Sequence, residues 1–211
     1  MKWKGAVAAD CYTGTMTLDF WFEFASTYSY PAAMRIGALA RTRGVPVRWR
    51  PFLLGPLFKA QGWDTSPFNL YPAKGRYMWR DLARTCDGFG LPFVQPAVFP
   101  QNTILAARVA LVAFAEGWGG DFTRAVYTAE FGEGGDIGQP ETIANLVMAL
   151  GHDAAAVIAR AQSDEKKLAL RKNTEEAQTL GIFGAPSFVT PDGELFWGND
   201  RPEAALDWMR R

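Results

Sequence analysis

The chain of 211 residues is long enough for one large domain with a substantial buried core. Hydrophobic residues make up 48% of it and charged residues 21%, a composition that excludes a disordered or collagen-like chain. Its 22 basic side chains are balanced by 22 acidic ones, so no overall charge draws it to nucleic acid or to an anionic membrane. We therefore expect neither nucleic acid nor a membrane as a partner.

Cysteine and histidine are scarce. The chain contains Cys11 and Cys86 without a Cys-x-x-Cys pair, and His152 is its one histidine. These residues exclude a disulfide framework and a thiolate metal site, and we expect no bound metal. No apolar run approaches the roughly 20 residues of a membrane helix. Residues 1–16 predict a disordered tail, and we expect a cytoplasmic protein with two incidental thiols.

The first half of the fold, residues 17–72, reads as strand, helix, strand and loop. Thr17–Phe24 alternates in polarity, which predicts a strand, and Tyr30–Arg43 predicts a helix. Val45–Leu54 predicts a second strand, parallel to the first because a helix connects the two. Gly55–Pro72 is rich in glycine and proline and predicts a long loop.

Helical patterns alone fill residues 73–180, a predicted helical insertion. The expected helices are Ala73–Phe89, Asn102–Glu116, Phe122–Phe131, Gln139–Leu150, Asp153–Ala161 and Glu165–Leu180. Gly117–Gly120 and Gly132–Gly135 resemble phosphate-binding loops. Neither follows a strand or ends in Gly-Lys-Ser/Thr, so both are interpreted as helix ends.

Strand character returns in residues 181–211. Ser187–Thr190 and Glu194–Trp197 flank Pro-Asp-Gly, which is typical of a hairpin. A closing helix follows, with Asp200 as its predicted N-cap and Glu203 as the capping-box partner. This order of elements predicts an α/β, thioredoxin-like fold with a helical insertion and a ligand cleft between insertion and sheet.

In such a fold the reactive group follows the first strand, at the start of the first helix. That turn is Ser26-Thr27-Tyr28-Ser29, with hydroxyls where a redox enzyme has cysteines, so the protein itself cannot exchange disulfides. A helix start favours an anion, including a thiolate that a ligand brings. The alternative is that Ser26 or Ser29 only caps the helix, because serine is a favoured N-cap.

Two further segments meet this turn in the expected topology. Ala185-Pro186 would face Ser26, and a cis peptide there would offer the N–H and C=O of Ala185 to a peptide-like ligand. Asn199, with backbone N–H groups, could hold an α-carboxylate, and Asp200 an α-ammonium. Simple helix capping by Asp200 is the alternative.

A series of short segments between Thr17 and Arg210 carries a family resemblance. The segments are Phe22–Tyr30, Trp49–Pro51, Leu53–Gly55, Pro72–Arg80, Phe99–Asn102, Gly181–Pro186 and Phe196–Arg201. Through them the chain resembles the 2-hydroxychromene-2-carboxylate isomerases, DsbA-like relatives of the kappa-class glutathione transferases. It departs from the family pattern at Thr27, where proline is usual, and at Trp63, where asparagine is frequent.

The resemblance implies glutathione as cofactor and a hydrogen bond from the catalytic Ser26 to its sulfur. Its thiolate would add to the ring-opened aromatic substrate, allow rotation about the former double bond, and leave. The cofactor-binding residues that the resemblance implies are Ser26, Lys74, Ala185, Pro186, Asn199 and Asp200.

A homodimer is also expected, with Trp63 and Trp79 as candidate surface aromatics. A kappa-type glutathione transferase or peroxidase, and a non-catalytic thioredoxin-like binding module, remain the alternatives.

Overall fold

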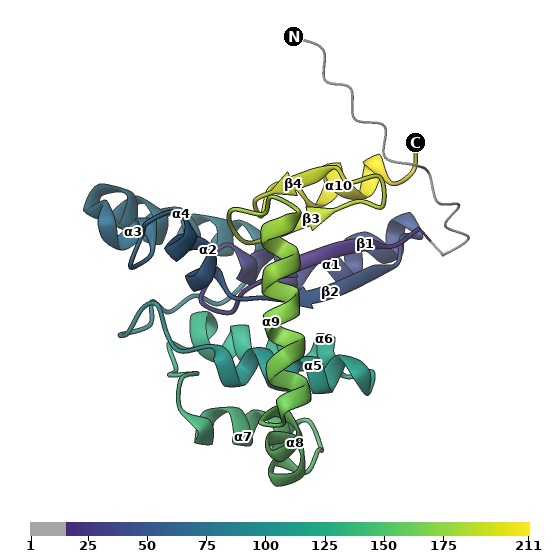
Figure 1. Ribbon diagram of the computed structural model, residues 1–211. Helices are drawn as coiled ribbons and strands as arrows, with labels where there is room; N and C mark the ends of the chain where they lie inside the picture. The colour runs from purple at the N-terminus through teal and green to yellow at the C-terminus, as the bar shows by residue number, and fades with distance from the viewer. Residues whose placement is uncertain (1–15) are drawn as a thin grey trace.

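The computed structural model describes residues 16–211 and has the predicted α/β, thioredoxin-like architecture with a helical insertion (Figure 1). Most of the predicted N-terminal tail, with Cys11, lies outside the described residues. No helix among residues 16–211 combines the length and apolar character needed to cross a bilayer.

Four strands form one mixed sheet in the order β2-β1-β3-β4. The strands are β1 (Leu18–Phe22), β2 (Val47–Pro51), β3 (Ser187–Val189) and β4 (Leu195–Trp197). β1 pairs in parallel with β2, which confirms the prediction from their helical connection. β3 pairs antiparallel with both β1 and β4, and its pairing with β4 confirms the hairpin. The two halves of the fold therefore share one sheet.

The central strand β1 is buried on both faces. On one face Phe20 stacks on Phe188, with ring centroids 5.2 Å apart, and meets Trp49 edge-on. On the other face Trp21 meets Phe52 at 6.0 Å and is fully buried. The alternation in Thr17–Phe24 thus separates two apolar cores, because helices cover both sides of the sheet.

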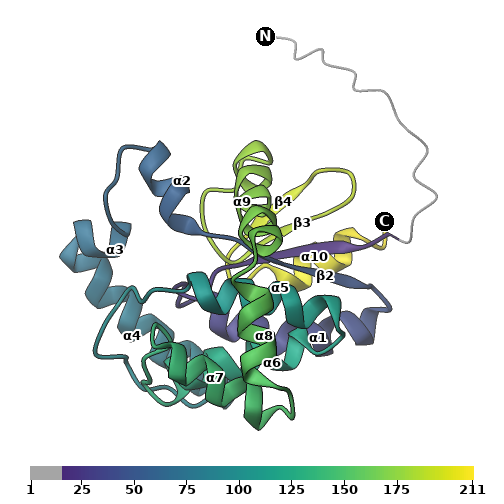
Figure 2. The same ribbon diagram turned by 60° about the horizontal axis from the view of Figure 1, so that its bottom comes forward.

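The helices divide between these two cores. α1 (Ser29–Arg43) and α10 (Pro202–Trp208) pack on the Phe20 side together with the core helices of the insertion. The insertion comprises α4 (Pro72–Phe89), α5 (Ile104–Ala115), α6 (Gly119–Tyr127), a π-helical turn η1 (Thr128–Gly132), α7 (Pro140–Ala149), α8 (Ala154–Ala161) and α9 (Asp164–Thr179). Figure 2 shows α9 running from the insertion to the sheet, where it contacts β2 and the helix α2 (Leu54–Ala60).

The prediction of an unstructured loop over Gly55–Pro72 is wrong. The segment holds α2 (Leu54–Ala60) and α3 (Pro67–Leu70). The Ser66 side chain accepts a hydrogen bond from the Phe68 amide, and Pro67 occupies the first turn, where its missing N–H costs nothing.

The prediction of an Asp200 N-cap is also wrong. The cap of α10 is Arg201, and it makes no side-chain capping bond. Glu203, the expected capping-box partner, forms an ion pair with Arg35 of α1 instead. A charged partner from another element thus replaces the local capping contact.

Trp63 and Trp79 are not exposed aromatics. Both are partly buried: Trp79 meets Phe99 edge-on at 4.8 Å, and Trp63 lies 5.9 Å from Phe58. They therefore give no support to a dimer interface, and the homodimer stays a prediction that rests on the resemblance.

Candidate active site

A pocket of about 2130 Å³ lies where the start of α1, helices α2–α4 and the loops before β3 and α10 converge. The structure thereby confirms a cleft between the sheet and the insertion. The residues expected at the site that line this pocket are Ser26, Lys74, Ala185, Asn199 and Asp200. Pro186, the remaining residue expected there, is not part of the lining.

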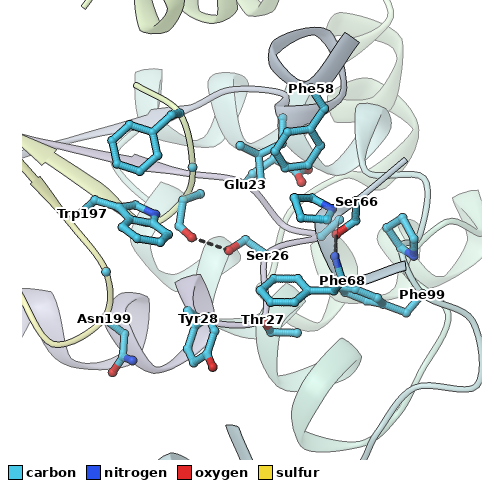
Figure 3. Close-up of a pocket in the computed structure, with 18 of the residues that line it drawn as sticks. Glu23, Ser26, Thr27, Tyr28, Phe58, Ser66, Phe68, Phe99, Trp197 and Asn199 are labelled. Atoms are coloured by element: carbon cyan, nitrogen blue, oxygen red, sulfur yellow. Dashed lines mark hydrogen bonds between the residues drawn. The ribbon is translucent and has the colours of Figure 1, made fainter. Parts of the chain in front are cut away.

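Ser26 and Ala185 are in contact in the wall of the pocket, and Figure 3 marks their hydrogen bond by the dashed line at Ser26. The Ser26 hydroxyl is almost fully buried and donates a hydrogen bond of 2.8 Å to the Ala185 carbonyl. The Ala185–Pro186 peptide is cis, as expected. The Pro186 carbonyl accepts a bond of 3.0 Å from the Gly198 amide, which ties the third segment to the same place.

The hydroxyls of this turn do not cap α1. The N-cap is Tyr28, which makes no side-chain capping bond, so the capping interpretation of Ser26 and Ser29 is wrong. The Ser29 and Tyr30 amides bond to carbonyl oxygens of the turn, whereas no partner within residues 16–211 is found for the Thr27 and Tyr28 amides. The helix start thus retains two donors beside Ser26 that suit an anion.

The loop before α10 is held by Arg35, a residue that sequence reasoning missed. Its guanidinium donates to the Asn199 carbonyl at 3.2 Å and pairs with Glu203 at 2.5 Å. It also lies 3.8 Å above the ring centre of Phe89. Asp200 remains exposed, with Arg201 at 3.5 Å. The Asp200 carboxylate is therefore accessible to a positively charged ligand group.

Two lysines bring positive charge to the opposite wall. Lys74 on α4 lies 4.8 Å from the ring centre of Tyr71, and Lys59 projects from α2. Both are exposed, and neither forms an ion pair with another residue of the range 16–211. Both are thus available to carboxylates. Lys59 was missed because its segment was predicted to be a loop.

Tyr28 is directed towards α4. Its hydroxyl donates to the Asp81 carboxylate at 2.9 Å, and Arg84 donates to the same group at 3.0 Å. Burial, followed by the bond to Asp81, raises the pKa of Tyr28 above its ordinary value. Tyr28 therefore stays neutral and forms part of the pocket wall.

Aromatic rings cover much of the remaining pocket surface. Phe58 and Trp63 lie together on one side, and Phe183 and Trp197 lie 5.0 Å apart on the other. Phe68 and Phe99 also line the pocket, on the side of Ser26 away from Trp197 (Figure 3). Flat apolar faces of this kind suit an aromatic ligand.

Glu23 is an acidic group in the pocket wall that the sequence did not single out. Its side chain is 5% exposed and accepts a hydrogen bond from Thr103. Burial raises the pKa of Glu23 to about 7, although the bonds from Thr103 and the Ala25 backbone oppose the shift.

Within residues 16–211, no group of three or more His, Cys, Asp or Glu side chains could hold a metal ion.

The family model for DsbA-like thioredoxin domains matches residues 17–209. The chain belongs to the DsbA-like thioredoxin family. Within it, the chain is 32% identical over 189 residues to a 2-hydroxychromene-2-carboxylate isomerase of Sphingobium xenophagum, covering 89% of this chain and 94% of that protein. It is 28% identical over 211 residues to glutathione S-transferase kappa 1 of Caenorhabditis elegans, covering 92% and 91% of the two chains.

A solved structure is similar to this fold over most of both chains. The structure of a 2-hydroxychromene-2-carboxylate isomerase superposes with a TM-score of 0.82 at 28% identity, over 93% of this chain and 95% of that one. The sequence-based resemblance to this branch of the family is thus confirmed.

Proposed function

We propose that this protein is a glutathione-dependent isomerase of the 2-hydroxychromene-2-carboxylate type, acting in the breakdown of naphthalene-type aromatic compounds. The observation that carries the proposal is the contact between Ser26 and Ala185 in the wall of one pocket. The same pocket is lined by Thr27 and Tyr28, whose amides have no partner within residues 16–211, by two lysines without an ion pair in that range, and by aromatic rings. The relatives named 2-hydroxychromene-2-carboxylate isomerase support the reaction, and the kappa relative supports glutathione.

Glutathione fits the polar groups of the pocket. Its sulfur would lie at the Ser26 hydroxyl and the Thr27 and Tyr28 amides, and its cysteinyl backbone at Ala185. Asp200 would pair with the γ-glutamyl ammonium. Asn199 would hold the carboxylate of the same γ-glutamyl end, and Lys74 the other carboxylate.

In this arrangement the Ser26 hydroxyl has to exchange partners. In the free protein its hydrogen is committed to the Ala185 carbonyl. When a thiolate binds, the hydroxyl turns to the sulfur, and the ligand's own amide can donate to the Ala185 carbonyl. A free thiol has a pKa of about 8.5, and a hydrogen bond to the charged sulfur of about 1.5–3 kcal/mol lowers it by one to two units.

The thiolate would add to the conjugated, ring-opened substrate between the aromatic walls. The former double bond then rotates as a single bond, and loss of the thiolate yields trans-o-hydroxybenzylidenepyruvate. Lys59, which lines the same pocket, would bind the substrate carboxylate, since Lys74 would bind glutathione in this arrangement. The reaction needs neither a metal nor a redox change, and glutathione is regenerated.

The kappa-type transferase or peroxidase is the second candidate, because the chain is 28% identical to glutathione S-transferase kappa 1. It would use the same thiolate on a different electrophile. A non-catalytic binding module would hold glutathione without turnover. A reducing cytoplasm, where glutathione is abundant, and a homodimer belong to the same proposal.

Turnover assays with glutathione separate these candidates. We expect 2-hydroxychromene-2-carboxylate to isomerise faster than an aryl halide is conjugated or a hydroperoxide reduced. Calorimetry should show glutathione binding at millimolar concentration or below, weakened by about 2 kcal/mol in Asp200→Ala. Absence of binding would refute the proposal, and binding without turnover of any of the three compounds would leave the binding module.

A further inference from the structure

Two buried carboxyl groups, those of Glu23 and Glu130, take no part in the reaction proposed above. Glu130, on the π-helical turn η1, is fully buried, and neither of its oxygens has a hydrogen-bond partner. Glu23, at the end of β1, lines the pocket that contains Ser26. The Ser26 amide donates to the Glu23 backbone carbonyl at 3.0 Å, so the acid and the hydroxyl belong to one turn.

The groups that contact Glu23 or shift the pKa of either acid are neutral or acidic, although Lys59 and Lys74 line the same pocket. The Tyr127 hydroxyl of α6 donates to the Glu23 carbonyl at 2.8 Å, and Thr103 donates to the Glu23 carboxyl. Glu130 is influenced further by Asp136. No lysine, arginine or histidine within residues 16–211 pairs with Glu23 or Glu130 or contributes to the pKa of either one.

The two carboxyl groups differ in their ability to change charge near neutral pH. Burial, followed by the charges of Glu23 and Asp136, raises the pKa of Glu130 well above its ordinary value, so Glu130 stays protonated. The pKa of Glu23 is raised to about 7, chiefly by burial. Glu23 is therefore ionised in part at neutral pH, and it is the member of the pair that can gain or lose a proton.

A thiolate at Ser26 would place a second negative charge in the pocket that Glu23 lines (Figure 3). Like charges close together in a poorly solvated site cannot both persist without a cation between them. We propose that Glu23 takes up the proton that a bound thiol releases when it becomes a thiolate at Ser26, so that the site carries one negative charge instead of two. This inference rests on the proposed binding of glutathione.

The proton balance of this step is simple. The S–H bond of the ligand breaks, and an O–H bond forms on the Glu23 carboxylate, either directly or by way of solvent. When the thiolate leaves the substrate and is protonated again, Glu23 releases its proton. Nothing is oxidised or reduced.

Calorimetry in two buffers of different ionisation enthalpy measures the protons that glutathione releases on binding. One pH unit above the pKa of Glu23, about a quarter of a free thiol with a pKa of about 8.5 is already ionised. We therefore expect the wild type to release close to none and Glu23→Gln to release about three quarters of a proton per bound glutathione. The ultraviolet absorption of the thiolate should be equal in the two complexes. The matched control is Glu133→Gln, an exposed acid three residues beyond Glu130, which should behave as the wild type does.

Replacing Glu23 by glutamine removes one of the charges that keep Glu130 protonated, so Glu130 becomes the remaining buried acid that a released proton could reach. The double variant Glu23→Gln/Glu130→Gln removes that route and should also release about three quarters of a proton. Equal proton release by the wild type and both of these variants, with thiolate present, would overturn the role of Glu23 and leave the proposed function standing. Glutathione that binds without thiolate absorption, or fails to bind, would instead refute the proposed function and this inference together.

Discussion

Replacing Ser26 by alanine tests the chemistry of the site most directly. The Ser26 hydroxyl is the side-chain donor in the turn that meets Ala185, and it is almost fully buried. Loss of a hydrogen bond to a charged sulfur costs about 1.5–3 kcal/mol, which raises the bound thiol's pKa by one to two units. The same loss in the transition state slows turnover by roughly 10- to 150-fold.

The substitution also affects the free protein. The Ala185 carbonyl loses its donor, but it lines the pocket, where water can replace the hydroxyl. We therefore expect a loss of about 1 kcal/mol of folding stability, seen as a fall in Tm of about 2–4 °C. Glutathione affinity measured above the shifted pKa should change little, because most contacts of the ligand lie elsewhere in the pocket.

The assay is a pH titration of the thiolate absorption of bound glutathione, together with the pH–rate profile. Ser26→Thr keeps the hydroxyl and should retain part of the shift. Ser29→Ala is the matched control, since Ser29 is buried and does not line the pocket. If Ser26→Ala leaves both the thiol pKa and the rate unchanged, stabilisation of the thiolate by this hydroxyl is refuted, and the Thr27 and Tyr28 amides become the remaining candidates.

Two further properties follow from groups whose pKa is displaced. Glu23 binds its proton more tightly in the folded protein, where its pKa is about 7, than in the unfolded chain, where it is 4.5, so folding stability should fall as pH rises between these values and level off above. Denaturant unfolding should show this loss, on the order of 3 kcal/mol, and Glu23→Gln should largely abolish it; a wild-type stability that is flat over that range would contradict the burial argument. Burial raises the pKa of the Cys86 thiol to about 11, so an alkylating reagent at neutral pH should modify Cys86 only after denaturation, as peptide mapping by mass spectrometry can show. Rapid labelling of Cys86 in the native protein would mean that α4 opens.

The order of the elements was readable from local patterns. Alternation, helix ends and the Pro-Asp-Gly turn depend on neighbouring residues. They predicted the parallel pairing of β1 with β2 and the hairpin of β3 with β4. The meeting of Ser26 with Ala185 followed from that topology, although the two residues are 159 positions apart. The same reasoning missed the short helices α2 (Leu54–Ala60) and α3 (Pro67–Leu70), because each is too short to show a helical repeat of apolar residues.

The electrostatic character of the site depended on contacts between distant segments. Arg35 holds the loop before α10 through partners 164 and 168 positions away, and one of them, Glu203, was expected to serve a local cap. Glu23 appeared to be an ordinary polar residue of an alternating strand. Its raised pKa arises because the insertion and the pocket wall remove its carboxyl from water, and no property of the neighbouring sequence reports that burial. Local patterns thus predict where the chain turns and pairs, whereas solvation and charge follow from what packs against each group in three dimensions.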